Sequence, residues 1–255
     1  MIDVNTVYTT VLYILNKEQR GYLTPEEFNS LATQVQLEVF EKYFEDLTQQ
    51  QRAVDVNDSE YANRVKTIKE KISSFETSDV ITSVGGIFTL DKGSASTDLT
   101  YDLHRLGTIE YTQPMTNNVT ASPRLLPVML EEVTQAEYNL IRRSKLTAPS
   151  HEWPIFTLKQ NNKVYTLPEL SEVEVYYVRK PQNPRWGYTI GTLGQYIYDS
   201  TAYDPNNPPT NSSKSTQFEI SNLDQTEVIL KILTYTGVII RDPQVIQVAS
   251  QMADI

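Results

Sequence analysis

The apolar residues of the first 76 positions recur every three or four residues, and this spacing most constrains what the chain can fold into. Side chains three and four apart share one face of a helix, so the spacing predicts helices. The first pattern has two adjacent stripes, Val4, Val7, Val11 and Ile14 beside Tyr8, Leu12 and Leu15. The second runs from Glu26 to about Gln51, again with two stripes: Phe28, Leu31, Val35, Val39 and Tyr43, then Leu37, Phe40, Phe44 and Leu47.

Two stripes on the second helix predict burial on two sides, as in the middle helix of a bundle. A third helix is expected over residues 59–75, where Tyr61, Val65, Ile68, Ile72 and Phe75 form a narrow seam. Residues 1–77 are therefore predicted to fold as a helical bundle.

Between residues 78 and 221 the pattern changes to short strands and turns. "IFTLKQNNKVYTL" predicts a hairpin, because its Asn pair suits the positive φ of a tight turn. "SEVEVYYV" alternates apolar and polar residues as a half-buried strand does. One helix is expected at about residues 135–146, with Thr134 and Glu137 as a capping box and Pro149 at its end. Residues 198–217, rich in Pro, Asn and Ser, are predicted to be an exposed insertion at the tip of a hairpin formed by "GQYIYD" and "TQFEIS".

Helical spacing returns near Asp224, and Asp242-Pro243 is expected to begin a last short helix. Residues 222–255 are predicted to pack with the N-terminal bundle. The fold class expected is thus α+β, with an N-terminal helical bundle, a central antiparallel β-rich region of residues 78–221 containing one helix, and C-terminal helices.

Composition narrows the function. The 255 residues carry a formal net charge of −10 and contain no cysteine and only two histidines, His104 and His151. This excludes thiol chemistry and sulfur-based metal sites. There is no basic patch with interleaved aromatic residues, so specific gripping of nucleic acid is not expected. No apolar run approaches the ~20 residues that span a bilayer, and the N-terminus has no signal-peptide pattern, so we expect no contact with membrane.

Nothing in the sequence indicates an enzyme. It contains no nucleophile elbow, phosphate loop or dinucleotide fingerprint. Gly85-Gly86 and the Gly191/Gly194 pair lack phosphate-binding spacing and are interpreted as turns. We therefore expect no catalytic residues, no cofactor and no metal ligands.

One segment has the length of a calcium loop, from Asn16 to Glu27. Such a loop needs oxygen ligands at its first, third, fifth and twelfth positions. Here Arg20 places a cation at the fifth position, so we do not expect calcium binding. The same residues predict a helix-to-helix corner, in which Thr24 is an N-cap and Glu27 completes a capping box.

Several blocks, spread over most of the chain, resemble a known family. "NKEQRGYLTPEEFNSLATQVQLEVFEKYFEDL" is similar to the opening of structural proteins of crAss-like and related bacteriophages. "EEVTQAEYNLIRRSKLTAPSHEWPIF", "VEVYYVRKPQNPRWGY" and "ILKILTYTGVIIRDPQVIQVASQ" are similar to later blocks of that family. Residues 198–217 and 85–98 fit the pattern least well.

The resemblance implies a component of the virion neck, assembled in the bacterial host cytoplasm. Such proteins are ring or adaptor proteins below the portal that join the capsid to the tail. The implied assembly is a homo-oligomeric ring of about twelve copies around the DNA channel, in contact with the portal and an adjacent ring or tail-hub protein. A negatively charged ring would let genomic DNA pass without sticking during ejection.

Candidate interface residues follow from this picture. Arg142, Arg143 and Lys145 form a basic run that would dock onto an acidic neighbour or be a solvated helix face. The insertion and the C-terminal segment are expected to order on neighbouring virion proteins. Their candidate contacts are Tyr203, Asp204, Asp242, Pro243 and Gln244.

Two other functions remain open at this point. The tyrosine content and the insertion suit a peripheral virion protein, namely a tail-hub, fibre-anchoring or glycan-contacting module. A calcium-regulated binding module is the third hypothesis, which calorimetry showing no calcium uptake would remove.

Overall fold

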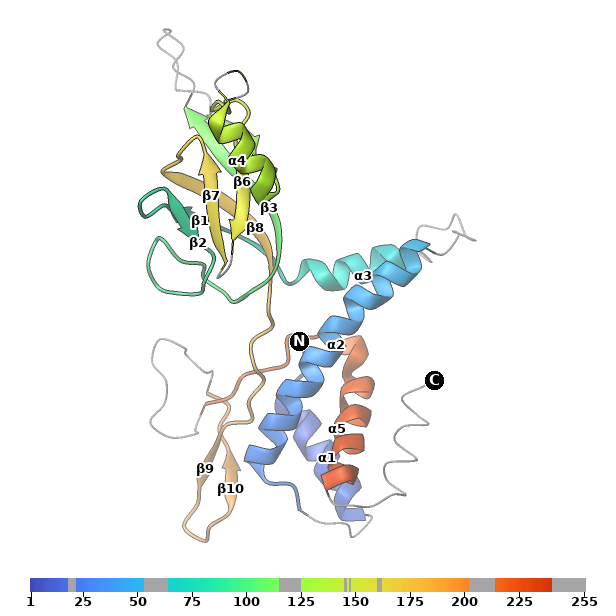
Figure 1. Cartoon of the computed structure of the whole chain (residues 1–255). Coiled ribbons are helices and arrows are strands. Elements are labelled where there is room, and N and C mark those ends of the chain that lie inside the picture. Colours follow the sequence, from blue (N-terminus) through green and yellow to red (C-terminus); the bar gives the residue numbers. More distant parts are fainter. Residues whose placement is uncertain are drawn as a thin grey trace. The chain divides into compact units, whose positions relative to one another are not determined.

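The computed structural model describes residues 1–17, 22–52, 64–114, 125–144, 146, 148–159, 162–201 and 214–239. The predicted fold class is confirmed: the chain is a mixed α+β protein with N-terminal helices, central strands and C-terminal helical structure. The chain divides into two compact units (Figure 1). The helical unit combines Met1–Ser73 with Pro181–Ile255, and the β unit is Ser74–Lys180.

In the helical unit, α1 (Val4–Lys17) and α5 (Gln225–Ile239) pack together, and α2 (Pro25–Arg52) contacts both α5 and α3 (Arg64–Ser73). The predicted burial of α2 on two sides is confirmed, since Val35 and Phe40 are both buried. Two stripe residues were wrongly expected in the core. Ile14 and Leu37 are exposed, because they lie outside the buried arcs of their helices, which include Val11 on α1 and both Val35 and Phe40 on α2.

The N-terminus of α2 has the predicted capping box. The backbone N–H of Thr24 donates to Glu27 Oε2 over 2.9 Å, and the N–H of Glu27 donates to Thr24 Oγ1 over 3.3 Å. Leu23 and Phe28, on either side of the cap, are both buried as a hydrophobic staple requires. The carboxylate of Glu27 is therefore engaged with Thr24 at the helix start.

Replacing Glu27 by glutamine is expected to lower the free energy of unfolding by at most ~1 kcal/mol. The hydrogen bonds from Thr24 lower the pKa of Glu27. A lowered pKa means that this contribution is present above the unfolded-state pKa and is lost as pH falls through the folded-state value. Chemical denaturation at pH 7 and at pH 3 should therefore show the difference only at pH 7. The control is Glu45→Gln, a change at an exposed position in the middle of α2. A strong rise in melting temperature with calcium would contradict the interpretation of residues 16–27 as a helix corner without bound calcium.

The third helix was expected to reach residue 75, but α3 ends at Ser73. Phe75 is buried beyond the helix end, immediately before strand β1 (Glu76–Thr82). The start of α3 proposed at residue 59 lies outside the described residues. Phe75 therefore does not belong to the helical seam, although its spacing fits it, since it lies in the β unit.

The β unit is a sandwich of two four-stranded sheets. The first has the order β1, β8 (Glu172–Arg179), β3 (Leu103–Pro114) and β4 (Leu125–Met129). The second has the order β2 (Ile87–Thr89), β7 (Lys163–Leu167), β6 (Ile155–Lys159) and β5 (Glu131–Glu132). Pairing is antiparallel as predicted except between β5 and β6, which are parallel. The core between the sheets includes Ile81, Ile109, Val173 and Val175 from the first and Phe88, Phe156 and Val164 from the second.

The predicted hairpin, the alternating strand and the capping box of this unit are confirmed. The hairpin of β6 and β7 is present, with Asn162 at a φ of 52° in its turn. Along β8, Val173, Val175 and Tyr177 are buried while Glu172 and Tyr176 are exposed. The capping box of Thr134 and Glu137 begins α4 (Gln135–Arg143).

The end of α4 differs from the prediction. The helix stops at Arg143 rather than near residue 146, because Ser144 is already extended, with a ψ of 122°. Leu146, the last residue of the expected helix, is exposed. Pro149 therefore lies well beyond the helix end. The helix proposed after Asp242 lies outside the described residues.

The expected domain division at residue 221 is wrong, because residues 181–221 belong to the helical unit. The expected pairing of "GQYIYD" with "TQFEIS" is wrong too. Strand β10 (Tyr196–Tyr198) pairs with β9 (Tyr188–Ile190), whereas Thr216 bridges to Arg185 and Phe218 to Ile2. A tight turn explains this, since the N–H of Gly194, at a φ of 81°, donates to the carbonyl of Gly191 over 2.9 Å. Two residues of the expected exposed insertion are placed otherwise, because Tyr198 lies in β10 and Ser215 is buried. Residues 202–213 of the insertion lie outside the described residues.

Candidate aromatic cleft

Trp186 is the centre of an aromatic cluster in the helical unit. Its ring lies 4.5 Å from that of Tyr8 on α1, between centroids. It also stacks with Tyr188 at 5.9 Å and with Tyr198 at 5.6 Å, one from each strand of the β9–β10 hairpin. Tyr8 in turn lies 4.8 Å from Phe28 on α2. The cluster therefore joins the hairpin to two helices.

Hydrogen bonds fix the position of Trp186. Its indole Nε1–H donates to Asn5 Oδ1 over 3.0 Å. Its backbone N–H donates to Asn29 Oδ1 over 2.7 Å, and Asn29 Nδ2 donates back to the Trp186 carbonyl over 3.3 Å. The next residue must be glycine, because a Cβ on Gly187 would lie 2.4 Å from the backbone of Lys214. The hairpin is thus held at its base by contacts that reach α1 and α2.

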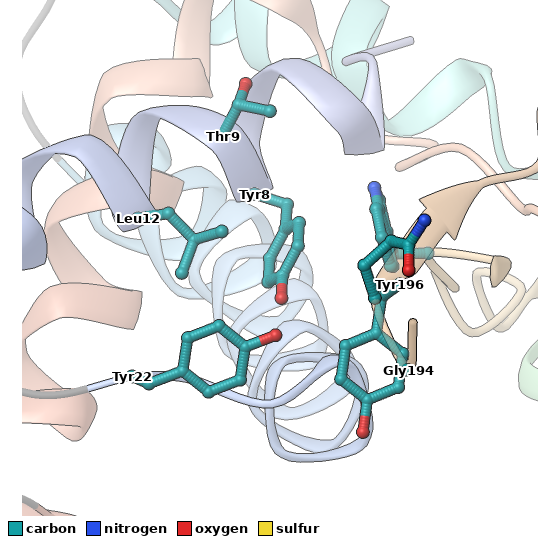
Figure 2. A pocket seen from close by; sticks show the side chains of 8 residues that line it. Tyr8, Thr9, Leu12, Tyr22, Gly194 and Tyr196 are labelled. Carbon is teal, nitrogen blue, oxygen red and sulfur yellow. The ribbon is translucent and has the colours of Figure 1, made fainter. Parts of the chain in front are cut away.

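A cleft of about 530 Å³ opens beside this cluster (Figure 2). Its lining comes from α1, from single residues just before α2 and β9, and from the end of the hairpin: Tyr8, Thr9, Leu12, Tyr22, Trp186, Gly194, Gln195 and Tyr196. No lining residue is an acid or a base. The hydroxyl of Tyr8 donates to the carbonyl of Leu23 over 3.0 Å, and burial raises the pKa of this hydroxyl. The cleft therefore suits an uncharged ligand or an apolar side chain.

The hairpin carries exposed apolar side chains next to the cleft. Ile190 is the cross-strand partner of Tyr196, so the two side chains lie on one face. Ile190 is 68% exposed and Leu193, in the turn, is 90% exposed. Tyr22 at the cleft edge is also exposed. The aromatic cleft is thus continuous with an apolar surface, which typically marks an interaction site. We call this set, Tyr22, Ile190, Leu193 and Tyr196, the hairpin surface.

The structure describes two of the predicted interface residues. Arg142 and Arg143 are exposed in the last turn of α4, in the β unit. Lys145, Tyr203, Asp204, Asp242, Pro243 and Gln244 lie outside the described residues. Of the predicted interface residues, the two that the structure describes therefore belong to a different unit from the cleft.

The cleft was not predicted from the sequence. The signal for it was the spacing of Trp186, Tyr188, Tyr196 and Tyr198, which places aromatic rings on one face of two short strands. Of the two tryptophans, Trp186 is buried and Trp153 is exposed.

Among the described residues no group of three or more histidine or acidic side chains could hold a metal ion. In the same part of the chain, no helix is both long and apolar enough to cross a membrane. No protein-family model matches the sequence, and no curated protein matches it.

Proposed function

We propose that this chain is a structural protein of a bacteriophage virion neck. In this role about twelve copies form a ring that surrounds the DNA channel and joins the portal and capsid to the tail. The proposal rests on the sequence resemblance described above. The structural observation that supports it most is the hairpin surface, a fixed apolar surface suited to contact with another protein.

A cyclic ring needs a heterologous interface, in which one surface of each subunit contacts a different surface of the next. The hairpin surface has the properties such a contact requires. Its side chains are apolar and exposed, and the contacts of Trp186 with Asn5 and Asn29 hold the hairpin in place before a partner arrives. Pre-organisation of this kind lowers the entropy lost on association.

The charge of the chain suits a channel lined by repeated subunits. Each copy contributes a formal charge of −10, so a ring multiplies a negative field. Acidic side chains that face the channel would repel the DNA phosphates. DNA would then slide through without being held by the protein.

The proposal is tested by the oligomeric state, measured by mass photometry and negative-stain microscopy, of the protein alone and mixed with its portal. Rings are expected for the wild type. Ile190→Asp with Leu193→Asp should abolish them, because charges replace the apolar contact. The control is Leu223→Asp, since Leu223 is also highly exposed in the helical unit but lies away from the hairpin. A monomer that binds neither the portal nor other neck proteins would contradict the proposal.

The cleft itself favours a second candidate, the peripheral glycan-contacting virion protein. Exposed aromatic rings such as Tyr22 and Tyr196 can stack on the apolar face of a neutral sugar, and no lining residue is charged. Binding on a glycan array that is lost in Tyr22→Ala would support this candidate. An array without signal, together with rings in the first test, would remove it.

A further inference from the structure

The outer face of the first sheet of the β unit carries an unusual row of side chains. Register places Val80 opposite Glu174, Glu174 opposite Glu110, and Glu110 opposite Met129 across four neighbouring strands. Directly opposed residues of antiparallel strands point to the same face, here the face away from the core. Two carboxylates therefore lie side by side in the middle of the sheet.

Like charges in direct cross-strand opposition destabilise a sheet. Among the described residues, no lysine or arginine forms an ion pair with Glu110 or Glu174. Beside them, burial and then the charge of Glu174 raise the pKa of Tyr176. Val80 and Met129, at the two ends of the row, are 54% and 63% exposed. The folded chain therefore keeps an unneutralised acidic pair between exposed apolar side chains.

The opposite side of the β unit carries exposed positive charges beside an exposed apolar side chain. Helix α4 ends in Arg142 and Arg143, both exposed, and Leu140 beside them is 69% exposed. An exposed leucine next to two guanidinium groups resembles an interface more than a solvated helix face. Arginine also forms paired hydrogen bonds with carboxylates, which lysine cannot match.

Alternation along the strands places these two surfaces on opposite sides of the β unit. Val164 of β7 points into the core between the sheets, so its neighbour Tyr165 points outward. Lys159 Nζ lies 3.7 Å from the ring centre of Tyr165 and 5.9 Å from that of Tyr138 on α4. Helix α4 therefore covers the outer side of the second sheet, whereas the carboxylate row lies on the outer side of the first.

We propose that the acidic row of one copy, Glu110 and Glu174 with Val80 and Met129, is the docking site for the α4 end of a second copy, Leu140, Arg142 and Arg143. This inference rests on the proposed ring. The two complementary surfaces lie on opposite sides of one unit, so the contact is heterologous and each copy can bind one neighbour on either side. Because the chain is strongly acidic overall, copies repel one another, and the opposite charges of these two surfaces offset that repulsion where they meet.

The like-charged pair gives the proposal a signature that a purely structural role would not produce. Glu110→Gln with Glu174→Gln removes the repulsion within each copy, so the variant should melt at a higher temperature than the wild type. The same variant should associate at least ~30-fold more weakly, because it loses charge-assisted hydrogen bonds to the arginines of the neighbour. Greater monomer stability with weaker association is the expected result.

Charge exchange tests the pairing directly, with association measured by sedimentation of fully folded variants, alone and on the portal. Arg142→Glu with Arg143→Glu, and separately Glu110→Lys with Glu174→Lys, should each prevent self-association. An equimolar mixture of the two variants, or all four changes in one chain, should restore it. Glu45→Arg with Glu70→Arg, two exposed sites of the helical unit, controls for the net charge of the Glu110→Lys, Glu174→Lys variant.

The outcomes separate the two proposals. If the wild type and both charge-reversed variants all form rings, the docking site is wrong and the proposed ring is unaffected. Loss of rings in both variants without restoration in the four-change chain would also overturn the pairing. A wild type that remains monomeric, alone and with its portal, would overturn both.

Discussion

Replacing Trp186 by alanine is expected to lower the free energy of unfolding of the helical unit by about 4 kcal/mol. Trp186 is 4% exposed and packs against Tyr8, Tyr188 and Tyr198. Truncation removes these contacts and leaves a cavity that the surrounding rings only partly fill. It also leaves Asn5 without its indole donor. A loss of this size is a large fraction of the stability of an ordinary domain.

The second tryptophan provides a matched control. Trp153 is 78% exposed, so Trp153→Ala should change stability by no more than about 0.5 kcal/mol. Denaturant unfolding followed by circular dichroism measures both variants. In Trp153→Phe, where Trp186 is the remaining tryptophan, fluorescence should be blue-shifted and should shift to the red on unfolding. Equal stability losses in the two alanine variants would contradict the role assigned to Trp186.

The features predicted from sequence are those set by residues close together in the chain. The capping boxes at Thr24 and Thr134 each close within three residues. The β6–β7 hairpin needs only Asn162 in a left-handed conformation between two strands. Hydrophobic spacing and side-chain chemistry suffice for such elements.

The domain division and the aromatic cleft were missed because they depend on residues far apart in the chain. Trp186 forms hydrogen bonds with Asn5 and Asn29, which are 181 and 157 positions away, and these bonds hold the start of the hairpin against the helices. Gln36 likewise donates to the carbonyl of Gln182, 146 positions away, and accepts from the N–H of Glu219. A local pattern contains no information on such partners. The aromatic cleft, which depends on them, could not be located from the sequence.

The acidic row depends partly on local sequence and partly on the pairing of strands far apart in the chain. The alternation that identified β8 also placed Glu174 on its outer face. Its neighbour Glu110 depends on the register between β3 and β8, which shifts between Leu106 and Ile109. Gly107 lies at this irregularity, where a Cβ would be 2.8 Å from the carbonyl oxygen of Tyr176. Which side chains of β8 point outward could thus be predicted from the sequence. The register that places Glu110 of β3 opposite Glu174 of β8 could not.

The second large effect is expected at Asp224, which joins three helical elements. Lys71 Nζ on α3 lies 2.8 Å from both of its carboxylate oxygens. The hydroxyl of Tyr43 on α2 donates to Asp224 Oδ2 over 2.5 Å. Asp224 itself ends the short 3-10 helix, Asn222–Asp224, that leads into α5. The side chains of Lys71 and Asp224 are mostly shielded from solvent, at 21% and 14% exposure.

Asp224→Ala is expected to destabilise the helical unit by about 3 kcal/mol, because it removes the carboxylate that a shielded ammonium group and a tyrosine hydroxyl share. Lys71→Met with Asp224→Ala should lose less than the two single changes added together, since both members of the ion pair are then removed. Denaturant unfolding of the four proteins of this double-mutant cycle measures the coupling. Lys42→Met, which removes an exposed partner of Glu227, is the control and should have a small effect.

The alkaline limb of the stability profile gives an independent check on the same network. Burial and the hydrogen bond to Asp224 raise the pKa of Tyr43 well above its ordinary value. A raised pKa means that the contribution is complete below the unfolded-state pKa of about 10 and is lost as pH rises through the folded-state value. Tyr43→Phe should therefore reduce the loss of stability between pH 10 and pH 12, measured by urea unfolding. An additive double-mutant cycle together with an unchanged alkaline limb would show that Asp224 does not join these helices.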